Sequence, residues 1–95
     1  MKESELVTKI KNYLNANYAC YFIKIHGSQY TTPGVSDLIG VFNGKFFAFE
    51  VKLPNKEKNL TKAQKLFLDL IRKSGGIAHV ITSIDQIKNI INEYM

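Results

Sequence analysis

Cysteine is almost absent from this sequence: Cys20 is the only one in 95 residues. A single cysteine cannot form an internal disulfide, so the chain fits a reducing compartment. It also leaves no cysteine pair for a zinc site, and no glycine-rich motif of the kind that cradles a phosphate is present. Because Cys20 lies in the apolar run 19–23, we expect it to pack as a small hydrophobic side chain rather than act as a nucleophile.

Long apolar segments are missing as well. No stretch approaches the roughly 18 apolar residues that a membrane-spanning helix requires, and residues 1–5 carry no apolar core of a signal peptide. We therefore expect a cytoplasmic protein without a membrane partner. The length of 95 residues suffices for one hydrophobic core, which predicts a single domain over residues 1–95.

The sequence does have an excess of positive charge. Thirteen lysine and arginine residues stand against eight aspartate and glutamate residues, which gives a net charge of +5 and a pI near 9.4. A basic balance in a small domain suits a polyanionic partner and says little about the fold. The alternative is a solvated basic surface, and charge alone favours nucleic acid only weakly.

Hydrophobic periodicity and turn residues predict alternating helices and strands. The helix from Thr61 begins with a capping-box pattern completed by Gln64, and it is long enough to connect two parallel strands. This predicts an α/β fold with a mixed sheet flanked by helices. In chain order the expected elements are a helix over 3–16, strands over 18–25, 36–42 and 45–52, a helix over 61–74, a strand over 77–82 and a last helix from 83.

Two short charged segments lie on either side of Asn43-Gly44, the strongest short hairpin signal. Asp37 is six residues before Asn43 and Glu50 is six residues after Gly44, so a hairpin places the two carboxylates nearly opposite each other. Glu50 and Lys52 share one face of their strand. Adjacent carboxylates repel unless they are neutralised, which a divalent cation does best.

The alternative for these charges is a solvated strand end or a simple salt bridge with Lys52. Against it, Glu50 follows the apolar run 46–49, where a largely buried position is expected, and aspartate is a poor strand former. The pattern therefore favours a functional carboxylate pair.

At this point the sequence resembles the PD-(D/E)xK nuclease superfamily and, more closely, the VRR-Nuc family. The residues that carry the resemblance are Gly34 to Asp37, Glu50-Val51-Lys52 and Gln64, within the same element order and over nearly the whole chain. Ser36 replaces the proline usual in the family, a loss that should be tolerated because that proline shapes the strand entry. The resemblance implies a restriction-endonuclease-like αβββαβ core plus a C-terminal helix.

The resemblance also implies a catalytic site that uses Mg²⁺ or Mn²⁺, which prefer oxygen ligands. Asp37, Glu50 and the backbone carbonyl of Val51 would be the ligands. Lys52 would orient or polarise the attacking water and stabilise developing charge. Gln64 would hydrogen-bond near the lysine or the phosphate, unless it serves only as the capping residue of its helix.

A further carboxylate ligand is expected from the first helix, and Glu3 and Glu5 are the candidates. Glu3 shares the core-facing stripe with Leu6 and Val7, whereas Glu5 points away from it. The segment 3–6 also resembles the first helix of archaeal Holliday-junction resolvases, in which the earlier glutamate is the ligand. We therefore prefer Glu3, although both acids could simply be favoured by the helix dipole.

Basic and polar residues near the expected site would hold DNA through its phosphates without reading its sequence. The alternative for each lysine is an ordinary solvated surface. The expected DNA contacts are Lys24, His26, Ser28, Lys56, Lys58 and Lys62.

These expectations describe a metal-dependent DNA endonuclease. The resemblance implies structure-selective cleavage of branched DNA such as four-way junctions, and a homodimer would match a two-fold substrate. The dimer interface would use either the apolar last helix or the aromatic segment 18–22. A less selective nicking or flap nuclease and a non-catalytic DNA-binding module are the alternatives. A phage or mobile element expressed in a bacterial host would be a suitable source.

Overall fold

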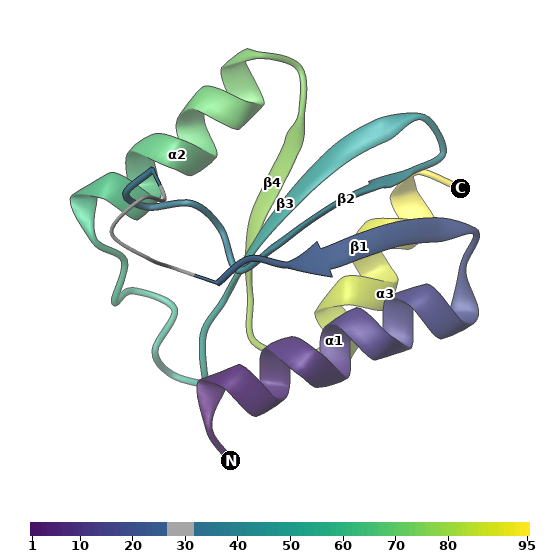
Figure 1. Cartoon of the computed structure of the whole chain (residues 1–95), viewed down its shortest axis with the longest axis horizontal. Helices are drawn as coiled ribbons and strands as arrows, with labels where there is room; N and C mark the ends of the chain where they lie inside the picture. Colours follow the sequence, from purple (N-terminus) through teal and green to yellow (C-terminus); the bar gives the residue numbers. More distant parts are fainter. Residues whose placement is uncertain (27–31) are drawn as a thin grey trace.

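The order of helices and strands predicted from the sequence is confirmed in the computed structural model, which describes residues 1–26 and 32–95 (Figure 1). The elements are α1 (Glu3–Asn17), β1 (Cys20–Lys24), β2 (Leu38–Phe42), β3 (Lys45–Val51), α2 (Lys62–Lys73), β4 (Ile77–Ile81) and α3 (Ile84–Glu93). None of the helices in the described residues has the length and apolar character needed to cross a bilayer.

The four strands form one mixed sheet in the order β1-β2-β3-β4. β1 pairs antiparallel with β2 and β2 antiparallel with β3, whereas β3 and β4 are parallel because α2 connects them as a crossover. Asn43 and Gly44 both have positive φ angles, 53° and 75°, as a two-residue type I′ hairpin turn requires. The predicted hairpin and the predicted parallel pair are therefore both present.

The main core lies between the sheet and the layer formed by α1 and α3. The predicted stripe of α1 is buried there, from Leu6 to Leu14, together with Ile87 and Ile91 of α3. Phenylalanine side chains fill the sheet side of this core, and the rings of Phe22 and Phe49 stack with centroids 5.6 Å apart. This packing fixes the position of β3, which ends next to the candidate site.

Helix α2 covers the opposite face of the sheet, but only over β3 and β4 (Figure 1). Ala48 and Ala78 are small enough for α2 to pack closely, and Leu68 of α2 is buried against them. The apolar stripe of α2 is only partly covered, because Leu66 and Leu70 remain 59% and 52% exposed. Among the residues that the structure describes, no helix covers the same face of β1 and β2.

Two strands begin two residues later than predicted, whereas every other strand boundary agrees to within one residue. The first strand begins at Cys20 rather than residue 18, because the Tyr18 backbone N–H donates to the Leu14 carbonyl and closes the last turn of α1. The second strand begins at Leu38 rather than residue 36, although the Ile25 N–H still donates to the Asp37 carbonyl over 2.8 Å. Asp37 is thus held beside the end of the sheet.

Candidate active site

The hairpin register brings Asp37 and Glu50 together at one end of the sheet. Leu38 pairs with Phe49, so the next residue outward on each side of the hairpin is Asp37 and Glu50. The backbone N–H of Val51 donates to Asp37 Oδ2 over 2.8 Å. This bond fixes the Asp37 carboxylate against the end of β3, next to the Glu50 side chain.

Glu50 is a buried carboxyl group without a full set of partners. It is only 2% exposed, and its Oε1 has no hydrogen-bond partner within the described residues. Burial, followed by the neighbouring Asp37 carboxyl, raises the pKa of Glu50 to about 9, while Lys52 partly opposes this rise. In the absence of a cation Glu50 therefore holds a proton at neutral pH, because its carboxyl group is buried beside a second carboxyl group.

Gln64 makes the capping contacts of its helix and also a contact with the carboxylate pair. Its Oε1 accepts from the Thr61 N–H over 2.9 Å and its backbone N–H donates to Thr61 Oγ1 over 3.1 Å, which completes the capping box of α2. Its Nε2 also donates to Glu50 Oε2 at 3.5 Å. The start of α2 is thereby linked directly to the buried carboxyl group.

Lys52 and Glu3 are the two further charged groups that act on Glu50. Lys52 directly follows β3, where its N–H donates to the Ile81 carbonyl over 2.9 Å, and its charge is close enough to lower the Glu50 pKa. Glu3 is half-buried at the start of α1, and its negative charge raises the Glu50 pKa. Glu5 is exposed. Within residues 1–26 and 32–95, no three His, Cys, Asp or Glu side chains cluster tightly enough to hold a metal ion, so Glu3 stands outside the pair.

The expected DNA-contacting residues lie in different places. Lys24 is on the α1 side of the sheet, where its Nζ lies 3.4 Å from the Ser4 carbonyl and 3.5 Å from Thr8 Oγ1. His26 is exposed just after β1, and Ser28 lies outside the described residues. The exposed lysines of the segment between β3 and α2 and of the first turn of α2 are Lys56, Lys58 and Lys62.

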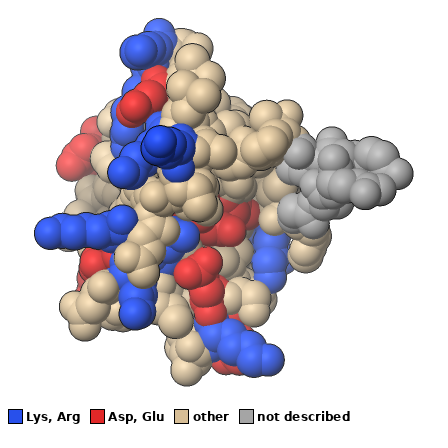
Figure 2. All heavy atoms as spheres, turned by 90° about the vertical axis from the view of Figure 1, so that its left-hand side faces the viewer, with Lys and Arg blue, Asp and Glu red and all other residues tan. Residues whose placement is uncertain are grey.

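The surface at this end of the molecule has acidic atoms at its centre and basic side chains around them. Figure 2 shows carboxylate groups in and around a recess, with lysine and arginine side chains projecting on several sides. Such a distribution is suited to a metal ion at the centre and a phosphate backbone across the rim.

Three residues that support the site were missed by the motif search or given no role in it. Gly34 has a φ of 83°, and a Cβ at this position would collide with the Ala63 carbonyl in the first turn of α2. Ser36 is fully buried and its Oγ has no hydrogen-bond partner in the described part of the chain. Thr61 anchors Gln64. In the sequence, the Pro33-Gly34 turn signal points to Gly34 and the capping-box pattern points to Thr61. No sequence signal points to Ser36.

The strand order, the α2 crossover and the paired carboxylates at the end of β3 define a restriction-endonuclease-like α/β fold. A solved structure described as "VRR_NUC domain protein" superimposes on this chain with a TM-score of 0.77, covering 99% of this chain and 88% of that chain at 20% sequence identity. The sequence matches no family model and no curated protein. The resemblance inferred from the motifs is thus confirmed at the level of the fold.

Proposed function

We propose that this protein is a divalent-metal-dependent DNA endonuclease. The observation that carries the proposal is the Asp37–Glu50 pair, in which two carboxyl groups adjoin and Glu50 Oε1 is buried without a hydrogen-bond partner among the described residues. A divalent cation would satisfy that oxygen and relieve the repulsion between the two groups. The likeness in fold to a VRR_NUC domain supports the same conclusion.

The residues around the pair have separable roles in this proposal. Asp37, Glu50 and the carbonyl of Val51 would hold Mg²⁺ or Mn²⁺, with Glu3 as an outer ligand on the α1 side. The bound ion would neutralise the scissile phosphate and activate a water molecule. Lys52 would orient that water and stabilise charge on the phosphate oxygens. Gln64 would keep the Glu50 carboxylate in place through its 3.5 Å contact.

The basic rim supports a nucleic-acid substrate. Exposed lysines flank the acidic centre on the segment between β3 and α2, and the chain as a whole carries a net charge of +5. We assign phosphate contacts to Lys56, Lys58 and Lys62, and to Lys24 and His26 at the end of β1. A DNA substrate and a single cysteine support a cytoplasmic site of action.

Branched DNA is the substrate class that best fits a domain of this size. One active site per chain and little surface for base recognition leave selectivity to the arrangement of two chains. A two-fold pair of such sites matches the two-fold symmetry of a four-way junction, so a homodimer is part of the proposal. A nicking or flap nuclease would use the same residues without this requirement.

The test compares cleavage of a synthetic four-way junction, a linear duplex and a flap with Mg²⁺ or Mn²⁺. Wild type, Asp37→Asn and the control Asp85→Asn, which removes an exposed carboxylate in the first turn of α3, are assayed together. Junction-selective cutting by wild type and the control, lost in Asp37→Asn, is the expected result. Equal cutting of all substrates would favour the less selective nuclease, and full activity of Asp37→Asn would remove the site assignment. Binding without any cutting would favour a non-catalytic module.

A further inference from the structure

The segment between β3 and α2 is strongly basic, yet it contains one carboxylate. The chain has five lysines between Glu50 and Asp69 but a single acidic residue, Glu57. Glu57 lies directly between Lys56 and Lys58, and all three side chains are exposed. A carboxylate between two proposed phosphate contacts repels DNA, so its position calls for a role that offsets this repulsion.

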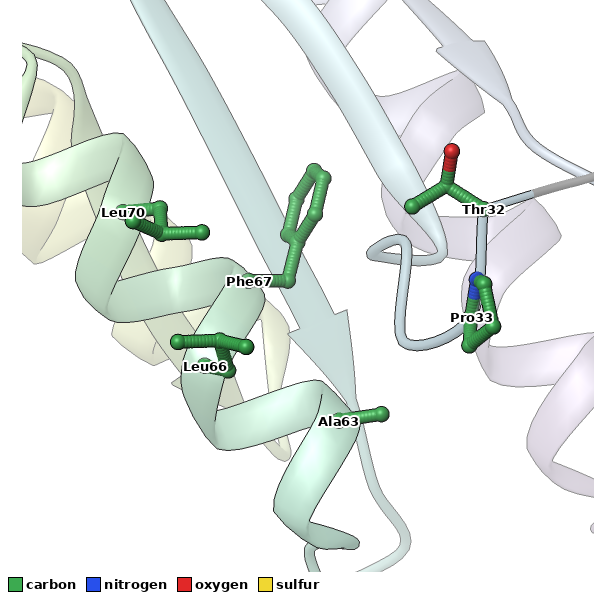
Figure 3. A pocket seen from close by; sticks show the side chains of 6 residues that line it. All are labelled: Thr32, Pro33, Ala63, Leu66, Phe67 and Leu70. Carbon is green, nitrogen blue, oxygen red and sulfur yellow. The ribbon is translucent and has the colours of Figure 1, made fainter.

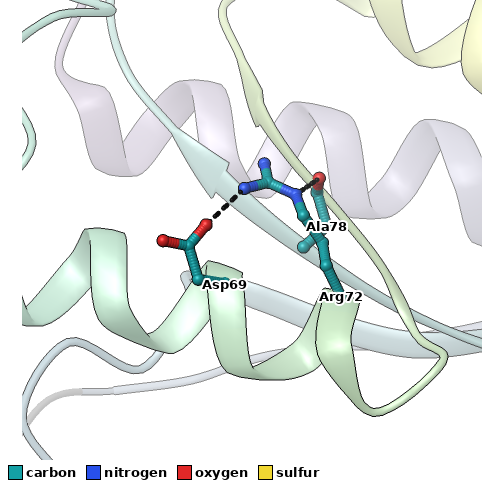
Figure 4. A network of polar contacts seen from close by, with 3 residues as sticks. All are labelled: Asp69, Arg72 and Ala78. Carbon is teal, nitrogen blue, oxygen red and sulfur yellow. Dashed lines mark hydrogen bonds and ion pairs between the residues drawn. The ribbon is translucent and has the colours of Figure 1, made fainter.

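A salt bridge with a neighbouring lysine does not supply that role. In the part of the chain that the structure describes, the one ion pair joins Arg72 and Asp69, with Nη1 and Oδ1 3.1 Å apart. Arg72 Nε also donates to the Ala78 carbonyl over 3.1 Å (Figure 4). This network lies in the last turns of α2, so Glu57 takes no part in it.

Glu57 lies in the second of two consecutive tight turns. In the first turn the Lys56 N–H donates to the Leu53 carbonyl over 3.0 Å. Pro54 and Asn55 occupy its central positions, and Asn55 has a φ of 70°. Proline followed by a residue of positive φ is the pattern of a type II turn. Asparagine tolerates this backbone better than most residues, so the sequence itself favours the first turn.

The Glu57 carboxylate ties the second turn to the first. In the second turn the Asn59 N–H donates to the Lys56 carbonyl over 3.0 Å. Glu57 follows Lys56 in this turn, and its Oε1 accepts from the Asn55 N–H over 3.2 Å. A carboxylate that accepts from a backbone N–H makes a charge-assisted hydrogen bond. Lys56 therefore lies at the junction of two turns that one side chain connects, and Lys58 lies within the second.

Both ends of residues 53–60, here called the lysine loop, are attached to the body of the protein. Leu53 packs against the main core, and Leu60 packs against the cluster under α2. After Leu60, the capping box of Thr61 and Gln64 begins α2. With its ends fixed in this way, the conformation of the middle of the loop depends on the two turns and on the bond that connects them.

The surface of α2 that follows the loop does not provide phosphate contacts in its place. Ala63, Leu66 and Phe67 line one side of a pocket of about 300 Å³, and Thr32 and Pro33 line the other (Figure 3). None of the described residues that line this pocket is charged. A phosphate backbone needs cationic partners, so on this side of the site the contacts depend on the lysine loop.

We propose that Glu57 is a positioning residue, whose bond to the Asn55 N–H holds the lysine loop in the conformation from which Lys56 and Lys58 contact DNA phosphates. This inference rests on the proposed nuclease function, because that function supplies the DNA. A loop that is ordered before binding loses less conformational entropy when the phosphates arrive. This gain offsets the repulsion from one exposed carboxylate, which salt screens.

The test compares two variants of equal net charge. Glu57→Gln removes the negative charge but keeps a side-chain oxygen that accepts from the Asn55 N–H, whereas Glu57→Ala removes both. Affinity for a labelled duplex is measured by fluorescence anisotropy in EDTA over a salt series. We expect Glu57→Gln to bind at least as tightly as wild type. Glu57→Ala should bind about 5-fold more weakly than Glu57→Gln, as one lost hydrogen bond predicts, with a shallower salt dependence and the same urea midpoint.

Exchange of the Asn55 amide proton, followed by NMR without DNA, measures the order of the loop separately from its proposed partner. Exchange should be slower in wild type and Glu57→Gln than in Glu57→Ala. Equal DNA affinity and equal salt dependence of the two variants would overturn the inference and leave the proposed nuclease in place. If wild type binds no DNA although exchange differs as expected, the proposed function fails, and Glu57 orders the loop for another reason.

Discussion

At the scale of single residues, Glu50 is the group on which the proposed chemistry most depends. Replacing this carboxyl group by an amide should abolish catalysis. The fold should stay intact, because glutamine has nearly the same shape as glutamate and needs no proton to be neutral. We expect Glu50→Gln to lower the cleavage rate at least about 10²-fold. Single-turnover cleavage and fluorescence anisotropy of labelled DNA measure the two properties separately, and DNA binding should survive. Unchanged cleavage would contradict the role given to this carboxylate.

The buried proton of Glu50 also predicts how stability depends on pH. The folded-state pKa of about 9 lies above that of an unfolded glutamate, so the folded protein binds more protons. Metal-free protein should therefore lose stability as pH rises from about 5 towards 9. Urea unfolding in EDTA at pH 6.0 and 8.5 measures this loss. The loss should be smaller in Glu50→Gln, and an equal loss in both proteins would show that Glu50 is not the group responsible.

At the scale of elements, the first turn of α2 determines where Gln64 lies. The Thr61 hydroxyl accepts from the Gln64 backbone N–H, and the Thr61 backbone N–H donates to the Gln64 side chain. Removing the hydroxyl breaks the first bond and should loosen the helix start that the second bond ties to Gln64. We expect Thr61→Val to destabilise the protein by about 1 kcal/mol, as lost N-caps do, and to slow cleavage about 10-fold or more. Thr61→Ser restores the hydroxyl and should restore both properties. Equal cleavage by the valine and serine variants would separate capping from catalysis.

The contact between Gly34 and α2 joins the segment before β2 to the same helix turn. Gly34→Ala should cost more than the strain of a positive φ, because its Cβ meets the Ala63 carbonyl. Gly75→Ala is the matched control, since Gly75 has a φ of 92° but open space around its Cβ. We expect about 1 kcal/mol for Gly75→Ala and a clearly larger loss for Gly34→Ala in urea unfolding. Equal losses would mean that this contact does not position α2.

Local signals explain which elements the sequence could predict. The Asn43-Gly44 turn, the capping box of Thr61 and Gln64, and the apolar stripe of α1 are each readable within a few residues. Tyr18 has a β-forming side chain, which predicts a strand, but its backbone N–H bonds the Leu14 carbonyl and ends α1 there. Residue propensities do not reveal such a backbone bond. The ends of helices and strands are therefore harder to predict from the sequence than the elements themselves.

At the scale of the whole molecule, the distribution of charge predicts how DNA is bound. Phosphate contacts by Lys56 and Lys58 should contribute to affinity without sequence preference. Changing both to glutamine should weaken binding to all duplexes alike and reduce the slope of log affinity against log salt by about 2. The control pair Lys9→Gln and Lys45→Gln has the same net charge but lies on α1 and at the hairpin turn. If the two pairs reduce the slope equally, the lysines act only through total charge.

Relations between distant elements account for what the sequence could not predict. The pairing of Asp37 with Glu50 followed from counting residues around one turn, whereas the contact of Gly34 with α2 depends on tertiary packing. Likewise, Leu66 and Leu70 belong to the same apolar stripe as their buried neighbours. Their exposure becomes clear only from the sheet, because α2 packs over β3 and β4 and stops short of β1 and β2.

The strand order also has a consequence for synthesis on the ribosome. Because each strand pairs with the one before it, α1 and the β1–β3 meander are complete once residue 51 has emerged. That half already carries both carboxylates, yet α2, which provides Gln64, and β4 follow later. The nascent chain therefore presents Glu50 to water until its C-terminal half docks, so the buried carboxyl group is among the last features of the native protein to form.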